Sequence, residues 1–89
     1  MAAKRLILRG QVQGVGFRAW LVARARALGI DGWVRNRADG AVEALLSGET
    51  DAVEELARLC RRGPPLAEVV SIVEDLAEPP DGPGFRALR

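Results

Sequence analysis

Hydrophobic and polar positions follow one another along this chain in two kinds of segment, one typical of strands and one typical of amphipathic helices. The pattern predicts four strands, with a short fifth that could follow, at residues 4–12, 31–37, 41–48, 67–76 and 84–89. A helical stripe lies over residues 17–28, and a second begins near Glu49 and ends before the Gly-Pro-Pro at 63–65. The predicted order is therefore strand, helix, strand, strand, helix, strand.

Each predicted helix has one apolar stripe and recognisable ends. The stripes consist of Phe17, Leu21, Ala25 and Leu28 in the first helix and of Val53, Leu56 and Cys60 in the second. Gly29 follows the first helix, where a glycine in the left-handed conformation is typical. At the start of the second helix, we expect Thr50 or Asp51 to act as the cap.

The β-α-β-β-α-β order is typical of the ferredoxin-like α+β sandwich, an antiparallel sheet with two helices on one face. The last residues could add a short C-terminal edge strand. We expect residues 1–89 to form one domain, because the chain has no internal linker, repeat or low-complexity tract. Many functions use this fold, so it decides nothing about chemistry.

Composition narrows the function classes. Thirteen basic and twelve acidic side chains give a formal net charge of +1, which argues against binding nucleic acid through bulk charge. The chain has one cysteine and no histidine, so we expect no intramolecular disulfide and no metal site. No apolar run is long enough for a signal peptide or a membrane span, and we expect a cytoplasmic protein.

One stretch stands out, "GQVQGVGFRAW" at residues 10–20, where the first strand gives way to the first helix. Gly14 and Gly16 allow backbone angles that let successive N–H groups point into one concavity. A helix N-terminus attracts anions, and Arg18 in the first turn can add a planar fork of donors that matches phosphate oxygens. The residues are compatible with an anion site, but from residue types alone a plain glycine turn beside a solvated arginine is the commoner arrangement.

The stretch "GQVQGVGFR", together with "LGIDGWVRNRADGAVE" and "RRGPPLAEV", resembles the acylphosphatase family over nearly the whole chain. Such proteins hydrolyse acyl phosphates to a carboxylate and inorganic phosphate without metal or cofactor. The resemblance implies a phosphate-binding loop whose members are Gln13, Gly14, Val15, Gly16, Phe17 and Arg18. It also implies two catalytic residues, Arg18 and Asn36, with the Asn36 amide holding the attacking water. From the residues alone, Asn36 is an ordinary turn residue.

The implied reaction needs few protein groups. A carboxylate is a good leaving group and needs no general acid at neutral pH. The phosphoryl transition state is loose, so backbone N–H groups and one arginine can stabilise its charge without magnesium. We therefore expect a monomer that acts on a small-molecule acyl phosphate and is inhibited by its product, inorganic phosphate.

Other residues have structural or functional interpretations. Trp20 could contact the acyl group or simply pack. We expect Trp33, Phe17 and Cys60 in the core. Arg37 follows Asn36 where some relatives of the family have threonine, which leaves any role of a hydroxyl in doubt.

Two rival functions remain open. The same domain occurs in a larger hydrogenase-maturation carbamoyltransferase, so the chain could be a non-catalytic module that binds carbamoyl phosphate or phosphate. RNA-recognition motifs share the predicted order of elements, but they need exposed aromatics on central strands. Here the strand at 41–48 has no aromatic residue, which disfavours RNA binding.

Overall fold

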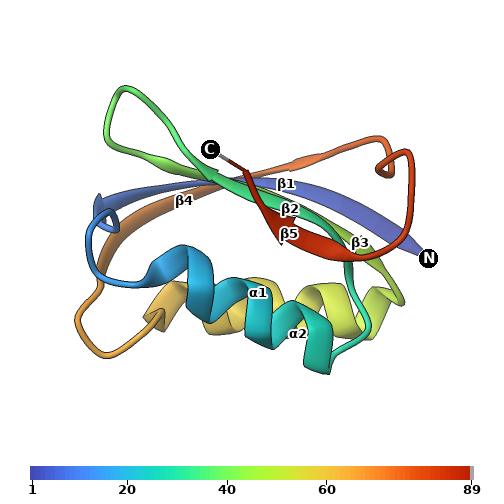
Figure 1. Cartoon of the computed structure of the whole chain (residues 1–89). Helices are drawn as coiled ribbons and strands as arrows, with labels where there is room; N and C mark the ends of the chain where they lie inside the picture. The colour runs from blue at the N-terminus through green and yellow to red at the C-terminus, as the bar shows by residue number, and fades with distance from the viewer. Residues whose placement is uncertain (89) are drawn as a thin grey trace.

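The computed structural model describes residues 1–88 and has the predicted order of elements, the short fifth strand included. Over this range the chain forms β1 (Ala2–Gln11), α1 (Phe17–Ala27), β2 (Asp31–Asn36), β3 (Val42–Gly48), α2 (Thr50–Arg62), β4 (Glu68–Leu76) and β5 (Phe85–Ala87). Both helices pack on the same face of the sheet, and the other face is open (Figure 1). The ferredoxin-like α+β prediction is confirmed.

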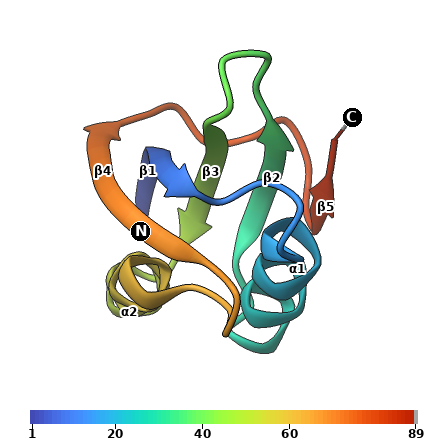
Figure 2. The ribbon, with the colours of Figure 1, turned by 90° about the vertical axis from the view of Figure 1, so that its left-hand side faces the viewer.

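The five strands form one sheet in the order β4-β1-β3-β2-β5. β1 pairs antiparallel with β3 and with β4, and β2 pairs antiparallel with β3. β5 runs parallel to β2 at the far edge, so the sheet is mixed rather than purely antiparallel (Figure 2).

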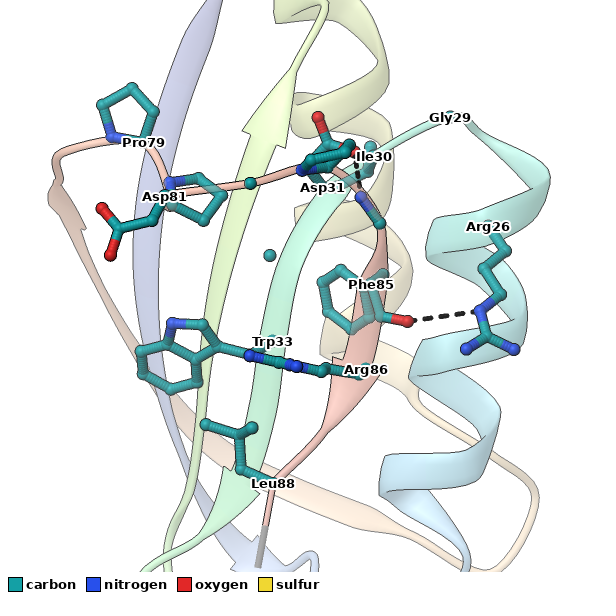
Figure 3. A pocket seen from close by; sticks show the side chains of 15 residues that line it. Arg26, Gly29, Ile30, Asp31, Trp33, Pro79, Asp81, Phe85, Arg86 and Leu88 are labelled. Atoms are coloured by element: carbon teal, nitrogen blue, oxygen red, sulfur yellow. Dashed lines mark hydrogen bonds between the residues drawn. The ribbon is translucent and has the colours of Figure 1, made fainter.

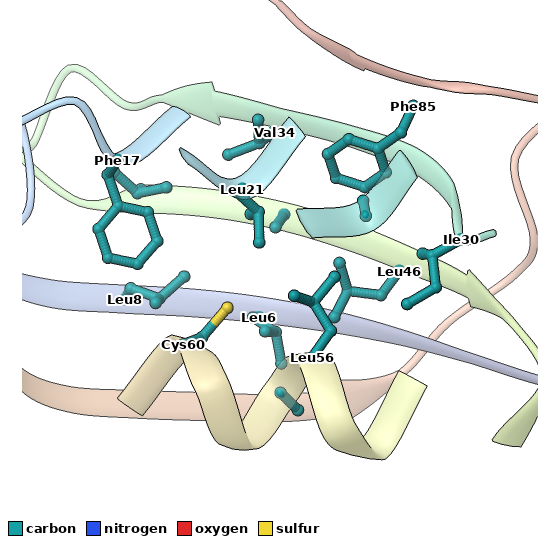
Figure 4. Close-up of a cluster of buried hydrophobic side chains, with 14 of the residues drawn as sticks. Leu6, Leu8, Phe17, Leu21, Ile30, Val34, Leu46, Leu56, Cys60 and Phe85 are labelled. Carbon is teal, nitrogen blue, oxygen red and sulfur yellow. The ribbon is translucent and has the colours of Figure 1, made fainter. Parts of the chain in front are cut away.

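The core lies between the helices and the inner strands (Figure 4). Alternate residues of β1 and β3 point toward the helices, and Leu6, Leu8 and Leu46 are fully buried. The predicted helix stripes face them, with Phe17 1% exposed and Cys60 0% exposed. Burial, with a smaller effect of Glu74, raises the pKa of the Cys60 thiol to about 12, so Cys60 is an inert core residue as predicted.

The helix ends agree with the prediction in one case and differ in the other. Gly29 has φ 69°, the left-handed conformation expected after α1. The cap of α2 is Glu49, one residue before the two candidates, and its side chain makes no capping hydrogen bond. Thr50 is already helical and Asp51 lies in the first turn, where its charge still suits the helix dipole. The predicted cap was therefore wrong.

Trp33 is not in the core, which corrects the prediction. The Val34 side chain points toward the helices and Gly32 is buried, so alternation turns the indole to the open face of the sheet. At Gly32 a Cβ would lie 1.9 Å from the Leu45 carbonyl oxygen, so only glycine fits this close approach of the two strands. The indole is partly buried, and the Arg35 guanidinium lies over it at 5.8 Å from the ring centroid.

The centre of the open face holds a buried charge. Glu43 on β3 is 4% exposed and accepts hydrogen bonds from Arg5 on β1 at 2.5 Å and from Arg35 on β2 at 2.7 Å. Burial alone would raise the pKa of Glu43, but the hydrogen bonds and charges of the two arginines outweigh it and hold the pKa below its ordinary value. This carboxylate links the three central strands.

Glu43→Gln is therefore expected to make stability less dependent on acid pH. The lowered pKa means that Glu43 contributes stability above its ordinary pKa of 4.5 and loses it as the pH falls through the lowered value. At pH 7 the variant should lose about 1–3 kcal/mol, toward the lower end because both arginines are about half exposed. The measurement is urea unfolding from pH 7 to pH 3, with exposed Glu78→Gln as control. A deficit that stays constant across this range would contradict the assignment.

Candidate phosphate-binding site

The two stretches that the sequence marked as functional meet at one edge of the sheet. β1 and β2 are both antiparallel to β3, so they run in the same direction and end at the same edge. β1 ends just before the glycine loop at residues 12–16, and β2 ends at Asn36. The loop and the β2–β3 hairpin therefore lie together at one end of the molecule (Figure 1).

The glycine loop has the geometry of an anion site. Gly14 has φ 74° and Gly16 has φ 79°, both left-handed, and a Cβ at either glycine would meet nothing within 4 Å. The glycines are thus needed for their backbone angles rather than for space. Gly16 is the N-cap of α1, and the first turn of this helix contains no acidic residue. The exposed N–H groups of the helix start can therefore receive an anion without a competing carboxylate.

Arg18 lies in the first turn of α1 and is partly buried. Its Nη1 donates a hydrogen bond to the Leu88 carbonyl oxygen at 3.0 Å, which ties the helix start to the chain just after β5. Among residues 1–88 no carboxylate forms an ion pair with Arg18. One end of the guanidinium fork is thus anchored by a neutral partner, with no carboxylate of the described residues paired to it.

Asn36 is the last residue of β2 and pairs with Val42. It comes two residues after Val34, which is fully buried against the helices, so alternation puts the Asn36 amide on the helix side of the sheet. The side chain is partly buried. Asn36 thus lies on the same side of the sheet and at the same edge as the start of α1.

Gln13 joins the loop to the hairpin. Its Nε2 donates to the carbonyl oxygens of Arg37 at 2.9 Å and of Ala41 at 3.0 Å. The prediction placed Gln13 in the loop only as a binding residue, whereas its side chain bonds to the neighbouring hairpin. The contact brings the residue before Gly14 against the residue after Asn36.

The hairpin is braced a second time by Asp39. The Ala41 N–H donates to the Asp39 carboxylate at 3.0 Å, and Arg37 and Arg9 lie 3.1 and 3.3 Å from it. The hydrogen bond from Ala41, followed by the charges of the two arginines, holds the pKa of Asp39 below its ordinary value. Arg37 therefore braces the turn instead of standing as an isolated solvated cation.

Trp20 lies one turn beyond the loop and is partly buried. Its ring meets the Phe17 ring edge to face at 5.4 Å between centroids, and the Arg24 guanidinium lies 5.7 Å from its centroid. Trp20 thus has a packing role, and part of its surface remains free beside the loop. Contact with an acyl group stays a prediction.

A separate hollow of about 880 Å³ lies at the other end of β2 (Figure 3). Trp33, Arg86 and the proline-rich segment 79–83 line it, and Arg26 donates to the Phe85 carbonyl oxygen at its side. The lining includes neither Asn36 nor any residue of the glycine loop.

In the part of the chain that the structure describes, no helix has the length and apolar character needed to cross a membrane.

Comparison with known proteins identifies the family. A family model for acylphosphatase matches residues 4–87. The acylphosphatase of Acidiphilium cryptum is 68% identical over 85 residues, covering 96% of this chain and 93% of the relative. That of Rhizorhabdus wittichii is 60% identical over 74 residues, covering 82% and 75%. The crystal structure of acylphosphatase from Bacillus subtilis superposes over the whole of both chains with a TM-score of 0.93 at 33% identity.

The chain belongs to the acylphosphatase family. The resemblance found in the sequence is thereby confirmed, and with it the reaction: the chain is a hydrolase that cleaves the carboxyl–phosphate bond of acyl phosphates. Its substrate is accordingly a small-molecule acyl phosphate.

Sequence reasoning missed the contacts that hold the candidate site residues together. The bond from Arg18 to Leu88 joins residues 70 positions apart, and no local sequence pattern predicts it. The bonds from Gln13 to the hairpin span 24 and 28 positions, which is also too far for a local pattern to indicate them. Only the Asp-Gly pair at 39–40, a strong turn signal, hinted that a braced hairpin would follow Asn36.

Gly16→Ala is expected to weaken phosphate binding while the fold persists. The left-handed conformation costs a residue with a side chain about 1–2 kcal/mol, so the loop should relax away from it. The inhibition constant of inorganic phosphate should then rise about fivefold to thirtyfold. Gly29→Ala is the matched control, because Gly29 has φ 69° with nothing near its Cβ position and follows the far end of α1. Equal phosphate inhibition in the two variants would contradict the role of the loop.

Proposed function

We propose that the phosphoryl group of the acyl phosphate binds to Arg18 and to the backbone N–H groups of residues 13–18, and that Asn36 holds the attacking water. The observation that carries this proposal is the meeting of the glycine loop and Asn36 at one sheet edge, on the helix side. An amide suits the task of holding water, because it can donate and accept at the same time.

Each group has a distinct task in this mechanism. The helix start and the Arg18 guanidinium stabilise the charge on the equatorial phosphoryl oxygens. Asn36 orients the water for in-line attack at phosphorus. The carboxylate leaves without a general acid, and a phosphate oxygen of the substrate is available to accept the proton of the water. The mechanism uses no metal. The partly exposed surface of Trp20 beside the loop supports a contact with the acyl group.

The chain supplies every group of this mechanism itself, so we propose that residues 1–89 act as one domain and as a monomer. Inorganic phosphate is the product and should compete for the loop. A buried cysteine thiol fits a reducing compartment, and we propose that the protein works in the cytoplasm. We propose no nucleic-acid partner, since the net charge is +1.

Arg18→Ala should lower kcat by about 10²–10³-fold and weaken inhibition by inorganic phosphate, because one preorganised cation is lost from the transition state. Benzoyl phosphate hydrolysis in the presence of a chelator is the assay, and a chelator-sensitive rate in the wild type would contradict the metal-free mechanism. The matched control is Arg26→Ala, which removes a similar bond from α1 to a β5 carbonyl at 3.2 Å but at the far end of the helix. Unchanged phosphate inhibition in Arg18→Ala would remove Arg18 from the site.

Asn36→Ala should lower kcat by about 10³-fold, equivalent to about 4 kcal/mol, while phosphate still binds. The reason is that the variant keeps the anion site and loses only the group that orients the water. The same benzoyl phosphate assay, with phosphate as inhibitor, separates the two effects. Full activity in the variant would refute the water-holding role. Background rates in both the wild type and the variant would instead favour a phosphate-binding module, and carbamoyl phosphate would be the next ligand to test.

A further inference from the structure

The side chain of Gln13 has an unusual position between the two halves of the proposed site. Gln13 immediately precedes Gly14 in the phosphate-binding loop, and its two acceptors are carbonyls of the β2–β3 hairpin. The first acceptor belongs to Arg37, the residue directly after Asn36. One side chain therefore spans from the loop itself to the neighbour of the residue proposed to hold the water.

The chemistry of the contact fixes which end of the amide makes it. Both acceptors are carbonyl oxygens, so only the NH₂ end of Gln13 can face them, with one hydrogen for each. Each carbonyl already accepts a backbone bond within the hairpin, from Gly40 N–H to Arg37 and from Arg37 N–H to Ala41. Gln13 fills their second lone pairs. A glutamate, a leucine or an alanine could not make this double contact at neutral pH.

The two carbonyls lie on opposite sides of the hairpin mouth, since Arg37 leaves β2 and Ala41 enters β3. Holding both fixes the translation and the tilt of the hairpin relative to the loop. The hairpin is braced internally by Asp39. Among the described hydrogen bonds, those of Gln13 alone join a side chain of residues 12–16 to residues 36–41.

We propose that Gln13 is a positioning residue, which sets the distance between the phosphate-binding loop and Asn36 and thereby aligns the water with phosphorus. Both hydrogens of the Gln13 side-chain NH₂ group bond to carbonyl oxygens of the hairpin, so this group does not bind the phosphate. This inference rests on the proposed role of Asn36. Misplacement of reacting groups by about 1 Å can cost 10²-fold in rate, so a small shift of the hairpin should be visible in kcat.

The first test compares Gln13→Ala with the wild type in benzoyl phosphate hydrolysis. We expect kcat to fall about tenfold to a hundredfold, while the inhibition constant of inorganic phosphate changes less than about threefold. Gln11→Ala is the matched control, because Gln11 is an exposed glutamine two residues earlier for which no side-chain bond is described. Thermal unfolding of each variant shows how much of the protein is folded in the assay. Unchanged kcat in folded Gln13→Ala, or a parallel loss of phosphate binding, would overturn the proposal.

A second variant, Gln13→Glu, adds a signature that a merely structural role would not give. At neutral pH its carboxylate would face two carbonyl oxygens and push the hairpin away, whereas the protonated acid could donate to one of them. We expect kcat relative to the wild type to recover at least threefold as the pH falls from 7 to 4. A ratio that is flat over this range would count against the hydrogen-bonded role.

The Asn36→Ala background separates this inference from the proposed function. If Gln13 acts through Asn36, adding Gln13→Ala to Asn36→Ala should lower kcat less than twofold further. A full additional loss would mean that Gln13 acts on the phosphate directly and would overturn the inference while leaving Asn36 in its role. Full activity of Asn36→Ala alone would refute the proposed function itself.

Discussion

Strand β3 pairs with β1 on one side and with β2 on the other, antiparallel in both cases. The two strands that flank β3 must therefore run in the same direction and end at one edge. Everything that the site needs follows from that shared edge: a loop that turns into a helix after β1, and an asparagine at the end of β2. The buried Glu43 on β3 bonds to an arginine of each neighbouring strand and so supports the same arrangement from the open face.

The site obtains its positive character from position rather than from an excess of basic residues. Thirteen basic and twelve acidic side chains nearly cancel over the chain. Most arginines on the open face form ion pairs with carboxylates, as Arg5, Arg9 and Arg37 do. Arg18 instead uses a neutral carbonyl as its described partner, at a helix start without acidic residues. A positive charge without a described carboxylate partner thus lies at the helix start, next to the glycine loop.

The amino-acid sequence was sufficient to predict those features that depend on the local pattern of apolar, polar and glycine residues. Periodicity predicted every strand and both helices, and the glycine loop followed from residue types alone. It failed for Trp33, because the pattern of β2 does not say which face meets the helices, and the buried Val34 takes that face and leaves Trp33 on the other. It also failed for the cap of α2, a choice between adjacent residues. The partners of Gln13 and Arg18 depend on distant carbonyls, and a carbonyl is present at every residue, so sequence cannot single them out.

The bond between Arg18 and Leu88 has a consequence for how the protein is made. Its two residues lie 70 positions apart, and Leu88 directly follows β5, so β5 must pair with β2 before the contact exists. On the ribosome the loop and α1 are synthesised before β5, so the helix can form earlier than this anchor of Arg18. Until β5 pairs, the Arg18 guanidinium lacks this restraint, and the order of synthesis thus separates the folding of α1 from the fixing of its first arginine.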